Sequence, residues 1–277
     1  MTSAQTALIG LLGWPVAHSR SPALHSAACA DTGIDASYLA LPVAPTALGD
    51  AVRGLAAVGA RGFNITLPHK QAVMAHLDVV EPAAKRIGAV NTVVRQDGGW
   101  RGMNTDAPGL VRSLEEAGVA LAGRNVVVLG AGGAARAAVV GCFEAGVDRL
   151  TVSARRPDAA GDLLRSTGVD GTATGLGDAL EAAFSDADLV VQATSATLHP
   201  EHAQPFADAL PLGALPAHAA VVDLVYSPRR TTVLCAAEAR GLTTVDGLGM
   251  LVWQAALAFG RWFDVPPPVE AMRRAAE

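Results

Sequence analysis

An apolar segment followed by a glycine-rich turn constrains the fold of this chain more than any other feature. Residues 125–129 read Asn-Val-Val-Val-Leu, residues 130–134 read Gly-Ala-Gly-Gly-Ala, and an alanine-rich segment continues to residue 145. An unbroken run of Val and Leu is typical of a strand that is buried on both faces of a parallel sheet. Glycines in the turn let the backbone approach a pyrophosphate, and the next helix offers its N-terminal N–H groups to the anion. The pattern therefore predicts an α/β fold with a dinucleotide site in this turn, the alternative being a plain tight turn. The predicted cofactor residues of the turn are Gly130, Ala131, Gly132, Gly133 and Ala134.

Strand-like and helix-like segments alternate through both halves of the 277-residue chain, as expected for crossover units around largely parallel sheets. In the first half we expect strands at 8–12, 38–42 and 61–66, helices at 22–31, 46–58 and 68–77, and a hairpin of 90–94 with 100–103. In the second half we expect strands at 125–129, 149–153, 189–193 and 221–225 and helices at 108–117 and 134–145. The predicted organisation is an N-terminal α/β substrate-binding domain over residues 1–107 and a Rossmann-type domain over 108–247, with a cleft between them. The apolar helix within 248–277 is expected to pack back on the first domain.

The residues after the second strand of the Rossmann pattern indicate which dinucleotide binds. NAD sites usually carry an Asp or Glu about 20 residues after the glycines, which binds the ribose 2′-hydroxyl. Here the strand at 149–153 is followed by Ala154, Arg155 and Arg156, and no acidic residue is present. A guanidinium suits a 2′-phosphate because it offers charge and paired hydrogen bonds. We therefore expect NADP(H) in preference to NAD as the cofactor, although one of the two arginines could simply face solvent.

Composition excludes several classes of partner. The formal net charge of −5 and the lack of a basic stripe argue against a nucleic-acid ligand. Cys29, Cys142 and Cys235 are too few and too far apart for a disulfide framework or a metal site, which favours the cytoplasm. No apolar run reaches membrane-spanning length, and we expect no signal peptide. A small-molecule substrate is expected, and the sequence does not distinguish a monomer from a homodimer.

Two charged residues in the first half are candidates for catalysis. Residues 64–70 read Asn-Ile-Thr-Leu-Pro-His-Lys, and residues 104–106 read Asn-Thr-Asp. Lys70 falls in the first turn of the helix expected at 68–77, where the positive end of the helix dipole repels an ammonium and favours the neutral amine. Such a lysine beside a carboxylate can form a proton-transfer pair. From these residues alone, the alternatives are a solvated Lys70 and an Asp106 that caps the next helix.

A small anion site is predicted where residues 13–22 read Gly-Trp-Pro-Val-Ala-His-Ser-Arg-Ser-Pro. Ser21, before Pro22, has the pattern of an N-cap. Its hydroxyl, that of Ser19 and the helix N-terminus would together hold a carboxylate, unless Ser21 only caps the helix. We interpret His18 and His25 as structural residues.

Seven motifs in order make the chain resemble the shikimate dehydrogenase family from Gly13 almost to the C-terminus. They are Gly13-x-Pro15-x-x-His18-Ser19-x-Ser21-Pro22, Asn64-Ile-Thr66-x-Pro68-x-Lys70, Gly88-Ala-Val-Asn91-Thr92, Asn104-Thr-Asp106, Gly130-Ala-Gly-Gly-Ala134, Asp223-Leu-Val-Tyr226 and Gly247-Leu-Gly-Met-Leu-x-x-Gln254.

The resemblance implies a reversible, NADPH-dependent reduction of 3-dehydroshikimate to shikimate in aromatic amino acid biosynthesis. By the same resemblance, Ser19 and Ser21 would hold the substrate carboxylate, and Lys70 and Asp106 would form the catalytic pair. Other matched residues would surround the substrate ring: Asn64, Thr66, Asn91, Tyr226 and Gln254. Matched residues on the cofactor side, besides the turn and residues 154–156, are Thr194, Leu224 and Gly247. No metal is implied.

The chain departs from the family pattern on the cofactor side. Ala154-Arg155-Arg156 stands where Asn-Arg-Thr is more frequent, and Gln192-Ala-Thr194 stands where Asn-Ala-Thr is usual. Two alternative functions remain at this point. One is quinate dehydrogenase activity or dual use of quinate and shikimate, and the other is a non-catalytic NADP-sensing module, whose signature would be loss of the Lys–Asp pair.

Overall fold

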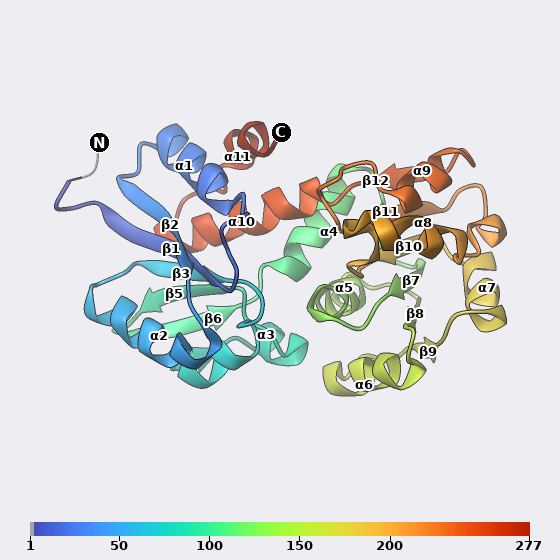
Figure 1. Cartoon of the computed structure of the whole chain (residues 1–277), viewed down its shortest axis with the longest axis horizontal. Helices are drawn as coiled ribbons and strands as arrows, with labels where there is room; N and C mark the ends of the chain where they lie inside the picture. Colours follow the sequence, from blue (N-terminus) through green and yellow to red (C-terminus); the bar gives the residue numbers. More distant parts are fainter. Residues whose placement is uncertain (1–2) are drawn as a thin grey trace. The chain divides into compact units, whose positions relative to one another are not determined.

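The computed structural model describes residues 3–277, which form two compact units (Figure 1). The first unit comprises the chain up to Thr105 together with Val252–Glu277, and the second comprises Asp106–Leu251. Each unit contains one six-stranded sheet with helices on its faces. The α/β fold class expected from the alternating segments is confirmed.

The sheet of the first unit is mixed. Its strand order is β2-β1-β3-β5-β6-β4, in which β1 is parallel to β2 and β3, while β5 is antiparallel to both β3 and β6. The sheet is therefore largely parallel, as expected, and β5 is the strand that runs against the others. The predicted hairpin, which is confirmed, follows β5 and restores the common direction in β6. The elements of this unit before Thr105 are β1 (Ala7–Gly13), α1 (Ser21–Thr32), β2 (Ala36–Pro42), η1 (Pro45–Ala47), α2 (Leu48–Ala57), β3 (Gly62–Ile65), η2 (Ala72–His76), β4 (Val79–Val80), α3 (Pro82–Ile87), β5 (Thr92–Gln96) and β6 (Gly99–Met103).

Alternating residues of β1 build two cores on opposite faces of this sheet. Leu12 packs with α2 and with Phe63 of β3 on one face. Ile9 packs on the other face with Trp262 of α10 (Leu248–Phe263), whose indole Nε1 donates to the Val93 carbonyl at 2.8 Å. Helix α11 (Val269–Ala276) lies beside α1 on that face (Figure 1). The end of α10 therefore packs on the first sheet, as the apolar segment predicts.

The sheet of the second unit is entirely parallel, with strand order β12-β11-β10-β7-β8-β9. Counted from β7 this is the 3-2-1-4-5-6 order of the Rossmann fold. The elements are α4 (Asp106–Glu116), β7 (Asn125–Leu129), α5 (Gly133–Glu144), β8 (Arg149–Ser153), α6 (Pro157–Thr167), β9 (Thr172–Thr174), α7 (Asp178–Ser185), β10 (Leu189–Gln192), η3 (Ala196–Leu198), α8 (Pro200–Asp208), η4 (Leu212–Ala214), β11 (Ala220–Asp223), α9 (Thr232–Glu238) and β12 (Thr243–Val245). In the described part of the chain, no helix has the length and apolarity that crossing a membrane requires.

The helix predicted over residues 68–77 is wrong. Residues 68–71 form turns, and only the short 3₁₀ helix η2 follows them. The Lys70 carbonyl accepts the Val90 N–H at 2.8 Å, so it is diverted from a helical ladder. The buried His69 ring bonds the Val43 carbonyl at 2.7 Å and holds the turn against the core. Lys70 therefore does not lie at the N-terminus of an α-helix, and the helix-dipole effect expected for it does not apply.

Candidate active site

The topology of the first sheet gathers the predicted substrate residues of this unit at one edge. Strands β1 and β3 are parallel and end at the same edge, so the segments carrying Ser21 and Lys70 both begin there. Strand β5 runs in the opposite direction, which brings its start, next to Asn91, to the same edge. Strand β6 reverses again and delivers Thr105 there, directly before Asp106.

The prediction that Ser21 caps helix α1 is wrong by one residue. Arg20 occupies the N-cap position without a side-chain capping bond, and α1 begins at Ser21 itself. The Arg20 guanidinium instead bonds the Ala276 carbonyl at the end of α11. The Ser21 N–H donates to Ser19 Oγ at 3.2 Å, which draws the two serines together. The Ser19 hydroxyl therefore lies at the start of α1, where an anion site is expected, although capping is not the reason.

Asn64 and Asn91 are buried in one hydrogen-bonded network behind this edge. Asn64 Nδ2 donates to the Asn91 carbonyl and to Thr92 Oγ1, both at 3.0 Å, and Asn64 Oδ1 accepts from the Tyr38 hydroxyl at 2.9 Å. Both amide hydrogens of Asn64 are thus donated within the protein. Asn91 Oδ1 accepts the Thr105 N–H at 2.8 Å, and Asn91 Nδ2 donates to Thr105 Oγ1 at 3.0 Å. The sequence patterns did not single out Tyr38 or Thr105.

The remaining predicted substrate residues lie as follows. Thr66 directly follows β3, and its N–H donates to the Leu12 carbonyl at 2.9 Å. Asp106 is buried and is the first residue of α4, a position where a carboxylate favours the positive end of the helix dipole. Gln254 is half-buried on α10. Tyr226 belongs to the second unit, in the segment after β11.

A histidine with no hydrogen-bond partner lies in the core next to this network. The His25 ring stacks on Tyr38 with centroids 4.2 Å apart, and its centroid is 5.2 Å from that of Trp262. Neither of its ring nitrogens has a hydrogen-bond partner within residues 3–277. Burial lowers the pKa of His25 from 6.5 to about 3, and the nearby Asn64 side chain offsets only part of this effect. His25 is therefore neutral in the folded protein at neutral and mildly acidic pH.

His25 should make the protein acid-sensitive. Between pH 6.5 and about 3 the unfolded chain protonates His25 while the folded protein does not. The free energy of unfolding should therefore decrease by about 1.4 kcal/mol for each unit by which the pH is lowered in this range, from this residue alone. His25→Phe keeps the stacked ring and should remove that slope. Urea unfolding at several pH values between 7 and 4 would measure this pH dependence. If the free energy of unfolding decreases equally with pH in the wild type and the variant, the prediction is wrong.

In the second unit, β7 leads directly into the glycine turn. Gly130 has φ +117°, and an added Cβ would lie 3.0 Å from Thr194 Cγ2 and 3.2 Å from the Ala193 carbonyl. A side chain would therefore be strained there. Gly132 and Gly133 have open space where a Cβ would point, and α5 begins at Gly133. The turn thus leaves the N-terminal N–H groups of α5 accessible to an anion, as the glycine pattern predicts.

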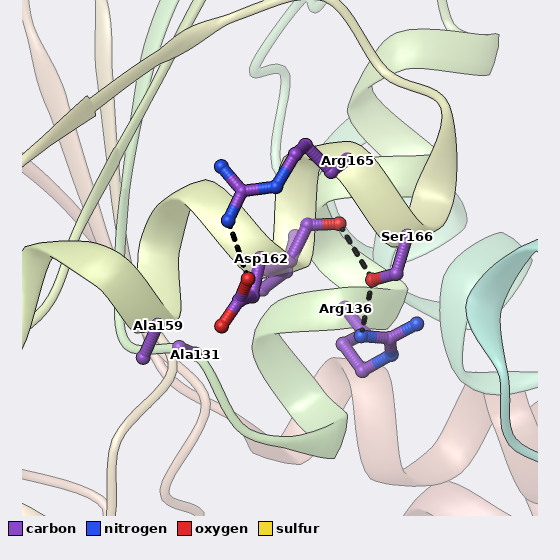
Figure 2. Close-up of a pocket in the computed structure, with 7 residues that line it drawn as sticks. Ala131, Arg136, Ala159, Asp162, Arg165 and Ser166 are labelled. Atoms are coloured by element: carbon purple, nitrogen blue, oxygen red, sulfur yellow. Dashed lines mark hydrogen bonds and ion pairs between the residues drawn. The ribbon is translucent and has the colours of Figure 1, made fainter.

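A hollow of about 520 Å³ extends from this turn between α5 and α6 (Figure 2). Arg136 of α5 lies on its wall and donates to Ser166 Oγ at 2.9 Å, while Arg165 pairs with Asp162. Burial lowers the pKa of the Arg136 guanidinium. The sequence interpretation passed over Arg136, although a basic residue three positions after the glycine pair was a visible signal of an anion site.

The other predicted cofactor residues follow the carboxyl ends of neighbouring parallel strands. Arg155 and Arg156 are exposed just after β8, and the half-buried Ala154 donates its N–H to the Thr174 carbonyl. Thr194 follows β10, where its N–H donates to Gln192 Oε1 at 2.6 Å. Gln192 also donates to Asp223 and Thr197, so the unusual glutamine builds a buried network of its own.

Gly247 lies against the backbone beyond β11. A Cβ at this position would come within 2.3 Å of the Leu224 carbonyl oxygen, so only glycine fits. Leu224 itself donates its N–H to the Gln192 carbonyl at 3.0 Å. The predicted cofactor residues therefore share the carboxyl edge of the second sheet, where Rossmann folds bind their ligands. Within residues 3–277, no group of three or more His, Cys, Asp or Glu side chains is arranged to hold a metal ion.

These features define a two-domain α/β protein whose second unit is a Rossmann-type domain with an accessible glycine turn. Family models match nearly the whole chain: the shikimate dehydrogenase substrate binding domain at residues 11–93, the shikimate/quinate 5-dehydrogenase model at 113–248, and the shikimate 5′-dehydrogenase C-terminal domain at 247–277. The chain belongs to the shikimate dehydrogenase family.

Relatives agree over almost the full length. The shikimate dehydrogenase (NADP(+)) of Symbiobacterium thermophilum is 48% identical, over 97% of this chain and 93% of the relative. The crystal structure of shikimate 5-dehydrogenase from Thermus thermophilus, in complex with NADP(H) and shikimate, is 40% identical with a TM-score of 0.87 over 98% of both chains. A 5-ketofructose reductase of Gluconobacter sp. strain CHM43 is 33% identical with a TM-score of 0.89 over 99% of both chains.

Proposed function

We propose that this protein is an NADP-dependent oxidoreductase that acts on a CH–OH group and interconverts 3-dehydroshikimate and shikimate. The observation that carries the proposal is the similarity over nearly the whole chain to a relative named shikimate dehydrogenase (NADP(+)). The substrate half of the chain also matches a family model named for shikimate dehydrogenase. On this proposal the protein serves aromatic amino acid biosynthesis in the cytoplasm, as a monomer or a homodimer.

The cofactor side of the proposal rests on the second unit. The glycine turn fits a pyrophosphate, because Gly132 and Gly133 leave its backbone open and α5 starts there. Arg155 and Arg156 would hold the 2′-phosphate of NADP(H), while Thr194, Leu224 and Gly247 would line the site at the carboxyl edge of the sheet. When bound, the nicotinamide supplies or accepts the hydride.

The substrate side rests on the first unit. Ser19 and Ser21 would hold the substrate carboxylate at the start of α1, where the Ser21 N–H donates to the Ser19 hydroxyl. Thr66, Asn91, Tyr226 and Gln254 would contact the ring and its hydroxyls. Asn64 belongs to the same site, but its two amide hydrogens are donated within the protein.

Proton transfer is assigned to Lys70 and Asp106. In the reductive direction the carbonyl oxygen of the substrate gains negative charge, and the Lys70 ammonium would donate a hydrogen bond or a proton there. Asp106 would orient Lys70 and the adjacent substrate hydroxyl. The presence of both residues argues against a non-catalytic NADP-sensing module.

Two similarities make quinate and 5-ketofructose the substrates to compare with shikimate and 3-dehydroshikimate. The family model over residues 113–248 is named for shikimate and quinate, and a 5-ketofructose reductase is similar over the whole chain. That family model covers the nucleotide half, so the name alone says little about the substrate. We expect NADP+ reduction with shikimate to exceed that with quinate, and NADPH oxidation with 3-dehydroshikimate to exceed that with 5-ketofructose. Comparison of the four values of kcat/KM would test this, and a preference for quinate or 5-ketofructose would overturn the substrate assignment.

A further inference from the structure

A buried tyrosine is the first donor in the hydrogen-bonded network that contains Asn64 and Asn91. Tyr38 of β2 is only 5% exposed, and its ring is held by stacking on His25 and by contact with Trp262, with ring centroids 6.1 Å apart. Its hydroxyl donates to Asn64 Oδ1 at 2.9 Å and also interacts with the Ser21 side chain. None of the sequence motifs includes this residue.

The direction of each hydrogen bond follows from the backbone groups in the network, because a carbonyl can only accept and an N–H can only donate. The Asn91 carbonyl can only accept, so the Asn64 group that faces it must be the NH2. Asn64 Oδ1 therefore faces Tyr38, and since an amide oxygen can only accept, the Tyr38 hydroxyl must donate. Without the Tyr38 hydroxyl, Asn64 Oδ1 would be a buried acceptor that lacks this donor.

The ordered hydrogen bonds continue from Asn64 to Asn91. The second hydrogen of Asn64 Nδ2 is donated to Thr92 Oγ1, and Thr92 Oγ1 lies 3.0 Å from Asn91 Oδ1 and 3.1 Å from Thr105 Oγ1. The Thr105 N–H, which can only donate, also binds Asn91 Oδ1 at 2.8 Å. The amide of Asn91 is therefore fixed with its oxygen toward Thr105, the residue directly before Asp106.

We propose that Tyr38 is a positioning residue of the substrate site, which acts through Asn64 and Thr92 to hold the amide of Asn91 and the segment at Thr105. Asn64 is then also a positioning residue. The inference rests on the proposed function, because Asn91 is taken to face the substrate.

A double-mutant cycle with Tyr38→Phe and Asn64→Leu tests this chain of contacts. Loss of order in the Asn91 amide should make Tyr38→Phe lower kcat/KM for shikimate about tenfold. KM for NADP+ should stay unchanged, because the cofactor residues lie in the other unit. In the Asn64→Leu background, Tyr38→Phe should have a much smaller effect, since leucine has no acceptor for the hydroxyl to orient and only its contact with the Ser21 side chain remains.

Two further variants separate positioning from simple loss of stability. Thr92→Val breaks the next link and should lower kcat/KM for shikimate by a similar factor. Thr167→Val removes an equally buried hydroxyl that bonds only main-chain carbonyls of α6, and it should leave kcat/KM unchanged. Wild-type kcat/KM in Tyr38→Phe, or effects of the two substitutions that multiply in the double variant, would overturn the inference. A wild-type protein inactive with shikimate would instead refute the proposed function and the inference with it.

Discussion

Lys70→Ala should lower kcat for shikimate oxidation by about 10²-fold or more, the usual effect of losing a general acid or base, while KM changes little. The reason is that the ammonium is assigned to the oxygen atom whose charge changes during hydride transfer, whereas the serines and amides bind the rest of the substrate. An interaction made mainly in the transition state affects kcat and not KM. Steady-state rates with shikimate and NADP+ would measure both constants.

The chain offers a matched control for this substitution. Its other lysine is Lys85, which is exposed in the last turn of α3. Lys85→Ala should leave both constants at their wild-type values. If Lys70→Ala keeps a near-normal kcat, the assignment of Lys70 to proton transfer is wrong.

Replacing Arg155 and Arg156 together by alanine should raise KM for NADPH about tenfold or more, the size expected when charge-assisted hydrogen bonds to a phosphate are lost. KM for NADH should change little, because NADH has no 2′-phosphate. The two arginines are exposed directly after β8, so the substitution disturbs no core contact. Initial rates with each coenzyme at saturating 3-dehydroshikimate would give both values.

Arg149 is the control for charge alone, since it lies at the opposite end of the same strand and pairs with Asp186. Arg149→Ala should raise neither KM. Equal use of NADPH and NADH by the wild type would contradict the role given to the two arginines.

The sequence predicted best where a local pattern has only one structural solution. The apolar run at 125–129 and the glycines after it correspond to β7 and the turn before α5, because a buried parallel strand and a φ of +117° each restrict the residue types strongly. The hairpin was also visible, since Asp97 and Gly98 both take positive φ at its turn.

The sequence predicted poorly where a contact far along the chain decides the local structure. The pattern at 68–77 has helical periodicity. However, the Val90 N–H donates to the Lys70 carbonyl, and the His69 ring bonds the Val43 carbonyl. Neither partner can be read from the segment itself. The start of α1 was missed by one residue, since Arg20 takes the N-cap position while its side chain bonds the Ala276 carbonyl, more than 250 residues away.

The same limit applies to the site. Ser21, Lys70 and Asn91 could be named from their motifs, and the strand directions then explain why they meet at one edge. Tyr38 could not, because a tyrosine in an alternating strand looks like an ordinary core residue. Its bond to Asn64 joins residues on strands β2 and β3, which lie on either side of β1 in the sheet.

The most direct test of the proposed function is the rate at which the purified protein oxidises NADPH when 3-dehydroshikimate is added. We expect NADPH to be consumed only in the presence of that substrate, and the reverse reaction to appear when shikimate and NADP+ are mixed. Lys70→Ala should lose this activity while the folded protein still binds NADPH. NADPH consumption that does not depend on 3-dehydroshikimate, or no consumption with folded wild-type protein, would contradict the proposed function.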